Sequence, residues 1–231
     1  MVQKYKSPVW VYKYPFELVM AAYERRFPSC ELIPVFVGSD ILREEISPDQ
    51  SIHIVERRCK INVDAPYILK KLAGVDYVYF IQINTLNKLE RKLTIKANNE
   101  SFANRITINE YCTYSTHPDN PDWTCFEQSA CLEVKSFFGF ETTVEKLAAK
   151  QYAQSISKGR EIIEYYIQKL KNEGITHVPR FKLPDNTPTS TSTTTTTTTI
   201  TNTTNNSTSN KPTNDTRTIS SPLNNSNYLI E

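Results

Sequence analysis

One long segment of helical periodicity follows a series of segments of strand periodicity, and this change of period restricts the fold more than any other feature. From Phe140 to Asn172 a single helical face carries Val144, Leu147, Gln151, Ser155, Ile162 and Tyr166. Gly174 follows as a C-terminal stop signal. At about 1.5 Å per residue such a helix is nearly 50 Å long, which is enough to cross a whole sheet.

Seven earlier segments have period two or are rich in β-branched and aromatic residues. They are VWVYKY (9–14), LIPVFVGSDILREEIS (32–47), SIHIVERRCKINV (51–63), DYVYFIQINTLN (76–87), RKLTIKANNE (91–100), RITINEYCTYSTHP (105–118) and DWTCFEQSACLEVKSF (122–137). A short helix is expected from Pro15, where a missing N–H is tolerated. The pattern predicts an α+β grip, in which an antiparallel sheet of six or seven strands curls around one long C-terminal helix.

The composition changes after VPRFKLP (178–184). Threonine, serine, asparagine and proline dominate residues 185–231, and residues 193–199 are all threonine. A segment with so little apolar surface cannot offset the entropy lost on folding. We therefore predict a folded domain over residues 1–184 and a disordered tail over residues 185–231.

Charge and hydropathy exclude several classes of function. The formal net charge is only +2 for 231 residues, so bulk electrostatics do not predict a nucleic-acid partner. No stretch approaches the roughly 18 apolar residues of a membrane-spanning helix. The N-terminus MVQKYKSPVWVYKYP lacks the apolar region of a secretory signal and does not have the composition of a transit peptide.

No catalytic, metal or cofactor motif is present. The five cysteines are odd in number and lack C-x-x-C spacing, which favours reduced thiols that pack in the core: Cys30, Cys59, Cys112, Cys125 and Cys131. The three histidines form no HExxH pattern, and no G-x-S-x-G or carboxylate cluster occurs. Glu127 is either a buried base or, as we expect, a satisfied strand carboxylate. The sequence therefore predicts no enzyme.

Three basic residues fall on or beside stripes that otherwise face the core. Arg26 lies at the edge of the apolar face of the short helix, whereas Arg25 points to the opposite side. In SIHIVERRCKINV, Arg57 shares the apolar face and Arg58 points the other way. Lys158 projects within about 40° of the apolar stripe of the long helix. An unpaired charge in such a position costs several kcal/mol, so each one needs a partner.

Two interpretations of these charges stay open. Each side chain can lay its aliphatic part along the core and reach solvent, or it can pair with a buried carboxylate such as Glu110 or Glu127. Alternatively, all three line the cationic end of an otherwise apolar cavity between sheet and helix. Such a cavity suits an anionic amphiphile, because arginine matches phosphate oxygens with paired hydrogen bonds and lysine supplies a point charge.

The segment NVDAPYILKKLAGVDY (62–77) interrupts the strands with a short amphipathic stretch. Its apolar and basic side chains are Tyr67, Ile68, Leu69, Lys70, Lys71 and Leu72. The segment is either a surface loop with one helical turn, or a lid whose apolar side chains enter a membrane surface while its lysines meet anionic headgroups.

The chain resembles the PRELI domain family of phospholipid-transfer proteins over about residues 2–184. The stretches that carry the resemblance are KSPVWVYKYPFELVMAAYERRFP, VGSD, IHIVERRCK, DAPYILKKLAGVDYVYF, DWTCFEQSA and FFGFETTVEKLAAKQY. Within the family it is most similar to the N-terminal PRELI domain of animal proteins that continue into CRAL-TRIO and GOLD domains. The threonine-rich tail stands where those domains would follow, so a short form and a truncated sequence both stay open.

The resemblance implies a START-like grip with a lid, and the carriage of phosphatidic acid or a similar anionic phospholipid between membranes. It implies headgroup-binding roles for Arg26, for Arg57 or its neighbour Arg58, and for Lys158. A further family lysine falls at Gln151, beside Lys150, which leaves the identity of the lipid open. The lid falls on residues 62–75.

The expected partners are an anionic phospholipid and, transiently, a membrane surface. Mitochondrial members of the family imply a small helical protein partner in the intermembrane space, whereas the more similar subgroup implies a cytoplasmic or Golgi-associated location. The alternative function is a protein-binding signalling or scaffold module that keeps the lipid-binding fold. Lipid that co-purifies with the protein would distinguish the carrier from the scaffold.

Overall fold

Eight strands in the described part of the chain form one antiparallel sheet. The structure, a computed structural model, describes residues 2–62, 71, 74–136 and 139–183, except for the side chains at 151 and 154–157. The sheet has the order β1-β8-β7-β6-β5-β4-β3, and β2 also pairs with β8. Its strands are β1 (Val2–Lys6), β2 (Trp10–Tyr12), β3 (Phe36–Ile46), β4 (Ile52–Asn62), β5 (Tyr77–Asn87), β6 (Lys92–Asn99), β7 (Ile106–Thr116) and β8 (Thr124–Val134).

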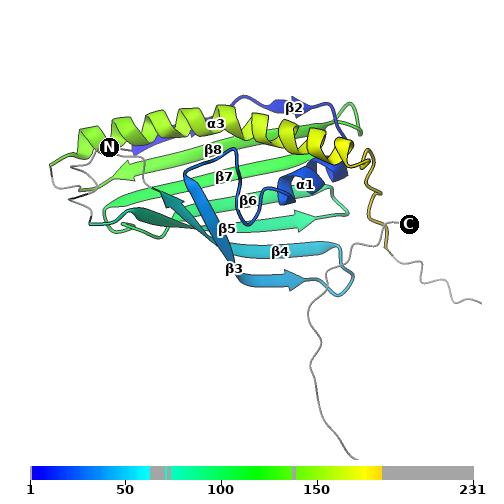
Figure 1. The fold of residues 1–231 in the computed structure, drawn as a ribbon, viewed down its shortest axis with the longest axis horizontal. Helices are drawn as coiled ribbons and strands as arrows, with labels where there is room; N and C mark the ends of the chain where they lie inside the picture. Colours follow the sequence, from blue (N-terminus) through cyan, green and yellow to red (C-terminus); the bar gives the residue numbers. More distant parts are fainter. Residues whose placement is uncertain (1, 63–70, 72–73, 137–138, 184–231) are drawn as a thin grey trace, which may run out of the picture. The chain divides into compact units, whose positions relative to one another are not determined.

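The two described helices are α1 (Phe16–Glu24) and α3 (Glu141–Asn172). Helix α3 has 32 residues and is therefore about 48 Å long. It runs along β8 and also contacts α1, which packs against β7 (Figure 1). The predicted α+β class, with a curled antiparallel sheet and one long C-terminal helix, is confirmed.

Local sequence explains where both helices begin or end. Pro15 precedes the first residue of α1, where its missing N–H costs no hydrogen bond. Helix α3 ends before Gly174, whose φ of +85° lies in the left-handed region that glycine adopts without strain. The amide of Ile175 then donates to the carbonyl oxygen of Leu170 at 2.9 Å and closes the last turn.

One face of the sheet, here the inner face, carries the core. Side chains directly opposite each other on paired strands point to the same face. Leu93, Tyr114 and Phe126 form such a row on β6, β7 and β8, and all three belong to the core that includes side chains of α1 and α3. The same row continues through Leu86 of β5 to His53 of β4. Arg57 is four residues after His53 on β4, so it points to the same face.

The inner face has two ends with different packing. At the packed end, α1 and the last turns of α3 cover the sheet, and the side chains are almost inaccessible: Tyr12, Phe16, Val19, Tyr23, Leu93, Tyr114, Ile162, Ile163, Ile167 and Leu170. At the half-buried end, the first turns of α3 cover Leu132 and Val134, and the surrounding side chains are only partly buried: Tyr5, Ile106, Ile108, Phe140, Val144, Leu147 and Ala148.

Two sequence predictions need correction. The sheet has more strands than the six or seven expected, because the short segment Val2–Lys6 pairs with β8 as β1. Lys158, expected on the buried stripe of the long helix, is exposed. The helical period identifies a face of the helix, but the depth of a side chain depends on what packs there. Among the described side chains of α3, the buried ones are Ile162, Ile163, Tyr166, Ile167 and Leu170, where α1 joins the core. Within the described residues, neither helix combines the length and the apolar character needed to span a membrane.

Candidate functional site

Arg26 lies one residue beyond the C-cap of α1 and is half-buried against aromatic rings. Its guanidinium carbon is 4.0 Å from the ring centre of Tyr23 and 5.0 Å from that of Phe27. Stacking on the two rings stabilises the cation. The Nε atom is inaccessible to solvent and has no hydrogen-bond partner among the described residues. Arg26 therefore keeps donor capacity that the fold does not use.

Arg57 reaches the same place from the sheet. It is only 8% exposed, and its guanidinium carbon lies 4.4 Å from the ring centre of Phe27. One nitrogen pairs with Glu24 at 3.1 Å, while Nε is buried without a described partner. Two guanidinium groups, from different elements, thus converge on one aromatic ring. We call Arg26, Phe27 and Arg57 the arginine cluster.

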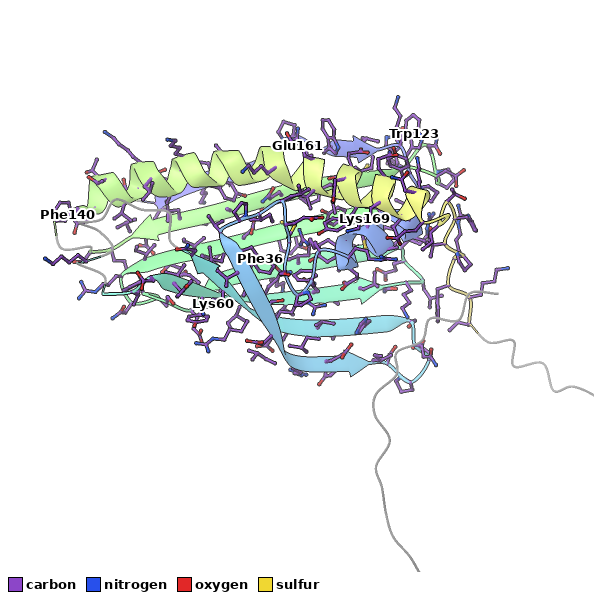
Figure 2. All side chains as sticks on the ribbon, in the orientation of Figure 1. Phe36, Lys60, Trp123, Phe140, Glu161 and Lys169 are labelled. Atoms are coloured by element: carbon purple, nitrogen blue, oxygen red, sulfur yellow. The ribbon has the colours of Figure 1, made fainter. Side chains whose placement is uncertain are left out.

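Neighbouring aromatic side chains hold the arginine cluster in place. The rings of Phe27 and Phe36 are 6.2 Å apart and meet edge to face. Phe36, at the start of β3, is labelled in Figure 2, where it lies beside the segment that follows α1. Tyr23 is fully buried, and burial raises the pKa of its hydroxyl to about 12, so it stays neutral under Arg26.

A polar network lies beneath the arginine cluster on β5. Gln82 donates from Nε2 to the hydroxyl of Tyr23 at 3.0 Å and to Oδ1 of Asn84 at 2.9 Å. Tyr23 donates in turn to the same Asn84 oxygen at 3.2 Å. The Nδ2 atom of Asn84 is buried with no described partner. These contacts fix the orientation of Tyr23 and so the ring on which Arg26 rests.

One acidic side chain, Glu110 of β7, lies on the inner face with the arginine cluster. Burial raises the pKa of its carboxyl, while the hydrogen bond from Gln128 and the positive charge of Arg26 act in the opposite direction. Burial also raises the pKa of the Cys59 and Cys112 thiols, so both remain protonated at neutral pH. All five cysteines of the chain are free thiols.

The other residues expected at the site lie elsewhere. Arg58 points to the outer face, where it pairs with Glu100 at 2.7 Å and stacks on Tyr79 at 4.1 Å. Lys150 and Lys158 are both exposed on α3. The structure therefore brings together Arg26 and Arg57 from the predicted set, and it does not bring Arg58 to them.

Neither carboxylate expected as a structural partner pairs with Arg57. Its partner is Glu24, the last residue of α1. Glu127 is exposed on the outer face of β8, and Glu110 accepts its hydrogen bond from Gln128 instead.

The predicted lid falls almost entirely outside the described residues. Of its residues expected to contact a membrane, only Lys71 is described, and it is exposed. Tyr67, Ile68, Leu69, Lys70 and Leu72 lie outside the described ranges, so the lid stays a prediction.

Two hollows are found on the outside of the fold, and neither includes the arginine cluster. One, of about 670 Å³, is lined mainly by outer-face residues such as Lys4, Lys96 and Tyr111, and its lining also includes Glu110 of the inner face. The other, of about 630 Å³, is lined by Trp10 and by residues of α3 that include Glu161, which is labelled in Figure 2. In the part of the chain that the structure describes, no group of three or more histidine, cysteine or acidic side chains could hold a metal ion.

Sequence reasoning missed Gln82 and Asn84. Their signal is present in FIQINTL, where the two polar residues alternate with Ile81 and Ile83. Alternation alone would place the isoleucines inside, but the pairing of Gln82 with Arg57 puts the polar residues on the inner face. The register of neighbouring strands was needed to choose between the two faces.

Fold and site together define an α+β grip whose inner face carries the arginine cluster. Residues 17–173 match the PRELI-like family, and the chain belongs to that family. Among solved structures, the fold is similar to that of the Zhui aromatase/cyclase of Streptomyces, with a TM-score of 0.51 at 11% identity over 75% of this chain and 99% of that chain. At this identity the similarity concerns the fold alone.

Curated relatives share much of the sequence. Protein real-time of Drosophila melanogaster is 56% identical over 80% of this chain and 28% of its own length. CRAL-TRIO domain-containing protein T23G5.2 of Caenorhabditis elegans is 53% identical over 82% of this chain and 26% of its own. Protein slowmo homolog of Dictyostelium discoideum is 31% identical over 70% of each chain. The chain thus spans little more than a quarter of the first two relatives.

Proposed function

We propose that this chain binds an anionic phospholipid of the phosphatidic acid type on the inner face of its sheet and transfers it between membranes. The observation that carries the proposal is the arginine cluster: two guanidinium groups converge on Phe27, and each has a buried Nε without a described partner. Phosphate oxygens are acceptors that match the fork of an arginine side chain. Membership of the PRELI-like family supports lipid binding or transfer.

The half-buried end supplies a surface for the acyl chains. Apolar side chains there are only partly covered by α3, at Ile106, Ile108, Val144 and Leu147. Covering such surface with hydrocarbon is favourable by about 25 cal/mol for each Å² removed from water. A ligand that places phosphate on the arginine cluster and hydrocarbon against this end would pair the arginine donors that have no described partner and cover the exposed apolar surface.

The finer parts of the proposal follow the family. We propose that the chain belongs with the family members that continue into CRAL-TRIO and GOLD domains; the name of the Caenorhabditis relative supports the CRAL-TRIO part of this proposal. Residues 62–75 act as a lid at a membrane surface, and the protein works in the cytoplasm or at the Golgi, with the mitochondrial intermembrane space and its small helical partner as the alternative. The proposal involves no catalytic step.

The test compares Arg26 with its neighbour. Arg26→Ala should weaken binding of short-chain phosphatidic acid by about 2 kcal/mol, roughly thirtyfold, because the phosphate loses a buried partner. Arg25→Ala is the matched control and should bind as the wild type does, since Arg25 is exposed and pairs with Glu173. Binding is measured by calorimetry, and folding of each variant by its melting temperature.

Two outcomes would contradict the proposal. Equal affinity of the two variants would remove Arg26 from the headgroup site. Wild-type protein that purifies without lipid and binds no phospholipid would favour the alternative, a protein-binding module that keeps the lipid-binding fold.

A further inference from the structure

Glu110 is an acidic side chain on the same inner face as the arginine cluster. It pairs with Ala97 of β6 on one side and Ala130 of β8 on the other. Through Ala97 and Gln82 the same row of the sheet leads to Arg57. The two alanines have short side chains, so no bulky group stands in this row between the carboxyl and Gln82 on one side or Tyr5 on the other.

The groups that face Glu110 come from four elements. Gln128 of β8 donates a hydrogen bond from Nε2 to Oε1 of the carboxyl. Cys112, two residues along β7, also hydrogen-bonds to it. The charge of Arg26 acts on it from the segment after α1, and the titratable hydroxyl of Tyr152 interacts with it from α3. Glu110 thus belongs to the electrostatic surroundings of the arginine cluster.

An anion bound at Arg26 changes these surroundings. Burial already raises the pKa of Glu110, and Arg26 is one of the groups that hold it down. A phosphate beside Arg26 would neutralise the positive charge that lowers the pKa of Glu110, and it would add a negative charge near the carboxyl. Both effects disfavour the carboxylate. The protonated acid, in contrast, has an O–H group that can donate to a phosphate oxygen.

We propose that Glu110 is protonated in the lipid complex and donates its O–H to the headgroup phosphate beside Arg26, so that one proton binds with each lipid. This inference rests on the proposed function. The proton comes from the solvent when the lipid enters and returns to it when the lipid leaves, and no covalent bond of protein or lipid changes. Glu110 therefore selects anionic phosphate headgroups and makes their release favourable at higher pH.

The sign of the pH dependence follows from this linkage. Below the pKa of Glu110 in the free protein the acid is already protonated, and affinity is constant. Between that pKa and the higher pKa in the complex, each pH unit weakens binding by up to tenfold. Above both values the affinity is constant again. The interval begins above the ordinary value of 4.5, because burial raises the pKa in the free protein.

The experiment measures binding of short-chain phosphatidylglycerol to the full chain from pH 5 to 9 by calorimetry. Its phosphodiester has no second ionisation, unlike a phosphomonoester with a second pKa of about 6. Wild-type affinity should fall with rising pH, whereas Glu110→Gln, which is permanently neutral and still a donor, should bind with pH-independent affinity. Glu127→Gln is the matched control on the outer face, and His53→Gln tests the inner-face histidine; both should keep the wild-type slope.

A second measurement needs no variant. Repeating the wild-type titration in two buffers with different ionisation enthalpies gives the number of protons taken up per lipid. Uptake that approaches one proton within the sloping interval supports the inference, and zero uptake throughout overturns it. A wild-type slope that persists in Glu110→Gln also overturns it while leaving phospholipid binding intact. Absence of any phospholipid binding in the wild type would instead overturn the proposed function.

Discussion

The two ends of the inner face are built from similar side chains but differ in how much of each is covered. At the packed end, Ile163 and Ile167 are fully inaccessible between α1 and the sheet. At the half-buried end, Val144 and Leu147 of the same helix remain partly accessible over Leu132. The difference teaches that α3 has two parts: its last turns belong to the packed core, whereas its first turns leave apolar side chains partly uncovered.

The arginines at the two ends of α1 repeat this contrast. Arg91 grips Glu17 in the first turn of α1 through two nitrogens, at 2.7 and 2.9 Å, and its third nitrogen donates to the carbonyl oxygen of Pro121 at 2.9 Å. Arg57 makes a single contact with Glu24 at the other end, and that carboxylate is 51% exposed. All three nitrogens of Arg91 donate to protein acceptors, whereas the buried Nε of Arg57 has no described partner. An unsaturated buried arginine is the one that points to a ligand.

The largest expected effect separates the two ends of α3. Ile163→Ala should lower the free energy of unfolding by about 4 kcal/mol, because it leaves a cavity between two packed layers. Leu147→Ala should cost only about 1 kcal/mol, since its side chain is partly accessible and the site can rehydrate. Denaturant unfolding of both variants measures the difference. If Leu147→Ala cost as much as Ile163→Ala, the half-buried end would be ordinary core, and the surface assigned to acyl chains would be lost.

The next effect separates the two arginines. Arg91→Ala should lower the free energy of unfolding by about 3 kcal/mol, because Glu17 is only 10% exposed and would be left unpaired. Its phospholipid affinity should not change. Arg57→Ala should change stability by less than about 1 kcal/mol, since Glu24 can regain water, and should weaken phospholipid binding by about tenfold or more.

Melting curves and binding isotherms on both variants provide the test. A destabilised Arg57→Ala with wild-type affinity would make Arg57 a structural residue like Arg91. In the Arg26→Ala background, Arg57→Ala should add less than its effect alone, because both guanidinium groups would share one phosphate.

Most of the fold could be predicted because period is a property of the local chain. Alternation identifies seven of the strands, and the helical period together with the stop signal at Gly174 identifies the long helix. The strand β1 was missed because Val2–Lys6 is short and rich in lysine, and its pairing with β8 is a contact between residues more than 120 positions apart. Such pairing depends on the finished sheet and leaves little local signal.

The sequence predicts which face of a helix or strand a site residue occupies, but it does not predict how deeply the residue is buried or which side chain it pairs with. Arg57 was placed correctly because alternation fixes its face, whereas Arg26 lies beyond the last residue of α1 and is positioned by its stacking on Tyr23. Lys158 was misplaced because periodicity identifies a face of α3 but does not show whether another element covers a given residue, and Lys158 is exposed. Glu110 was expected as a possible partner of a basic side chain, but its hydrogen bond to Gln128 depends on the register of β7 and β8, which the sequence does not display.

The smallest expected effect concerns Arg25, the exposed neighbour of Arg26. It pairs with Glu173 at 2.8 Å and joins the end of α1 to the C-cap of α3, with side chains 45% and 37% exposed. Exposed ion pairs contribute about 0–1 kcal/mol, because water competes for both charges. A double-mutant cycle of Arg25→Ala and Glu173→Ala should therefore give a coupling of about 0.5 kcal/mol, which falls further in 1 M salt. A coupling above about 2 kcal/mol would mean that this pair, rather than the buried Tyr23 and Ile163, fastens α1 to α3. The contrast between a packed end held by apolar contacts and a half-buried end would then fail at its simplest point.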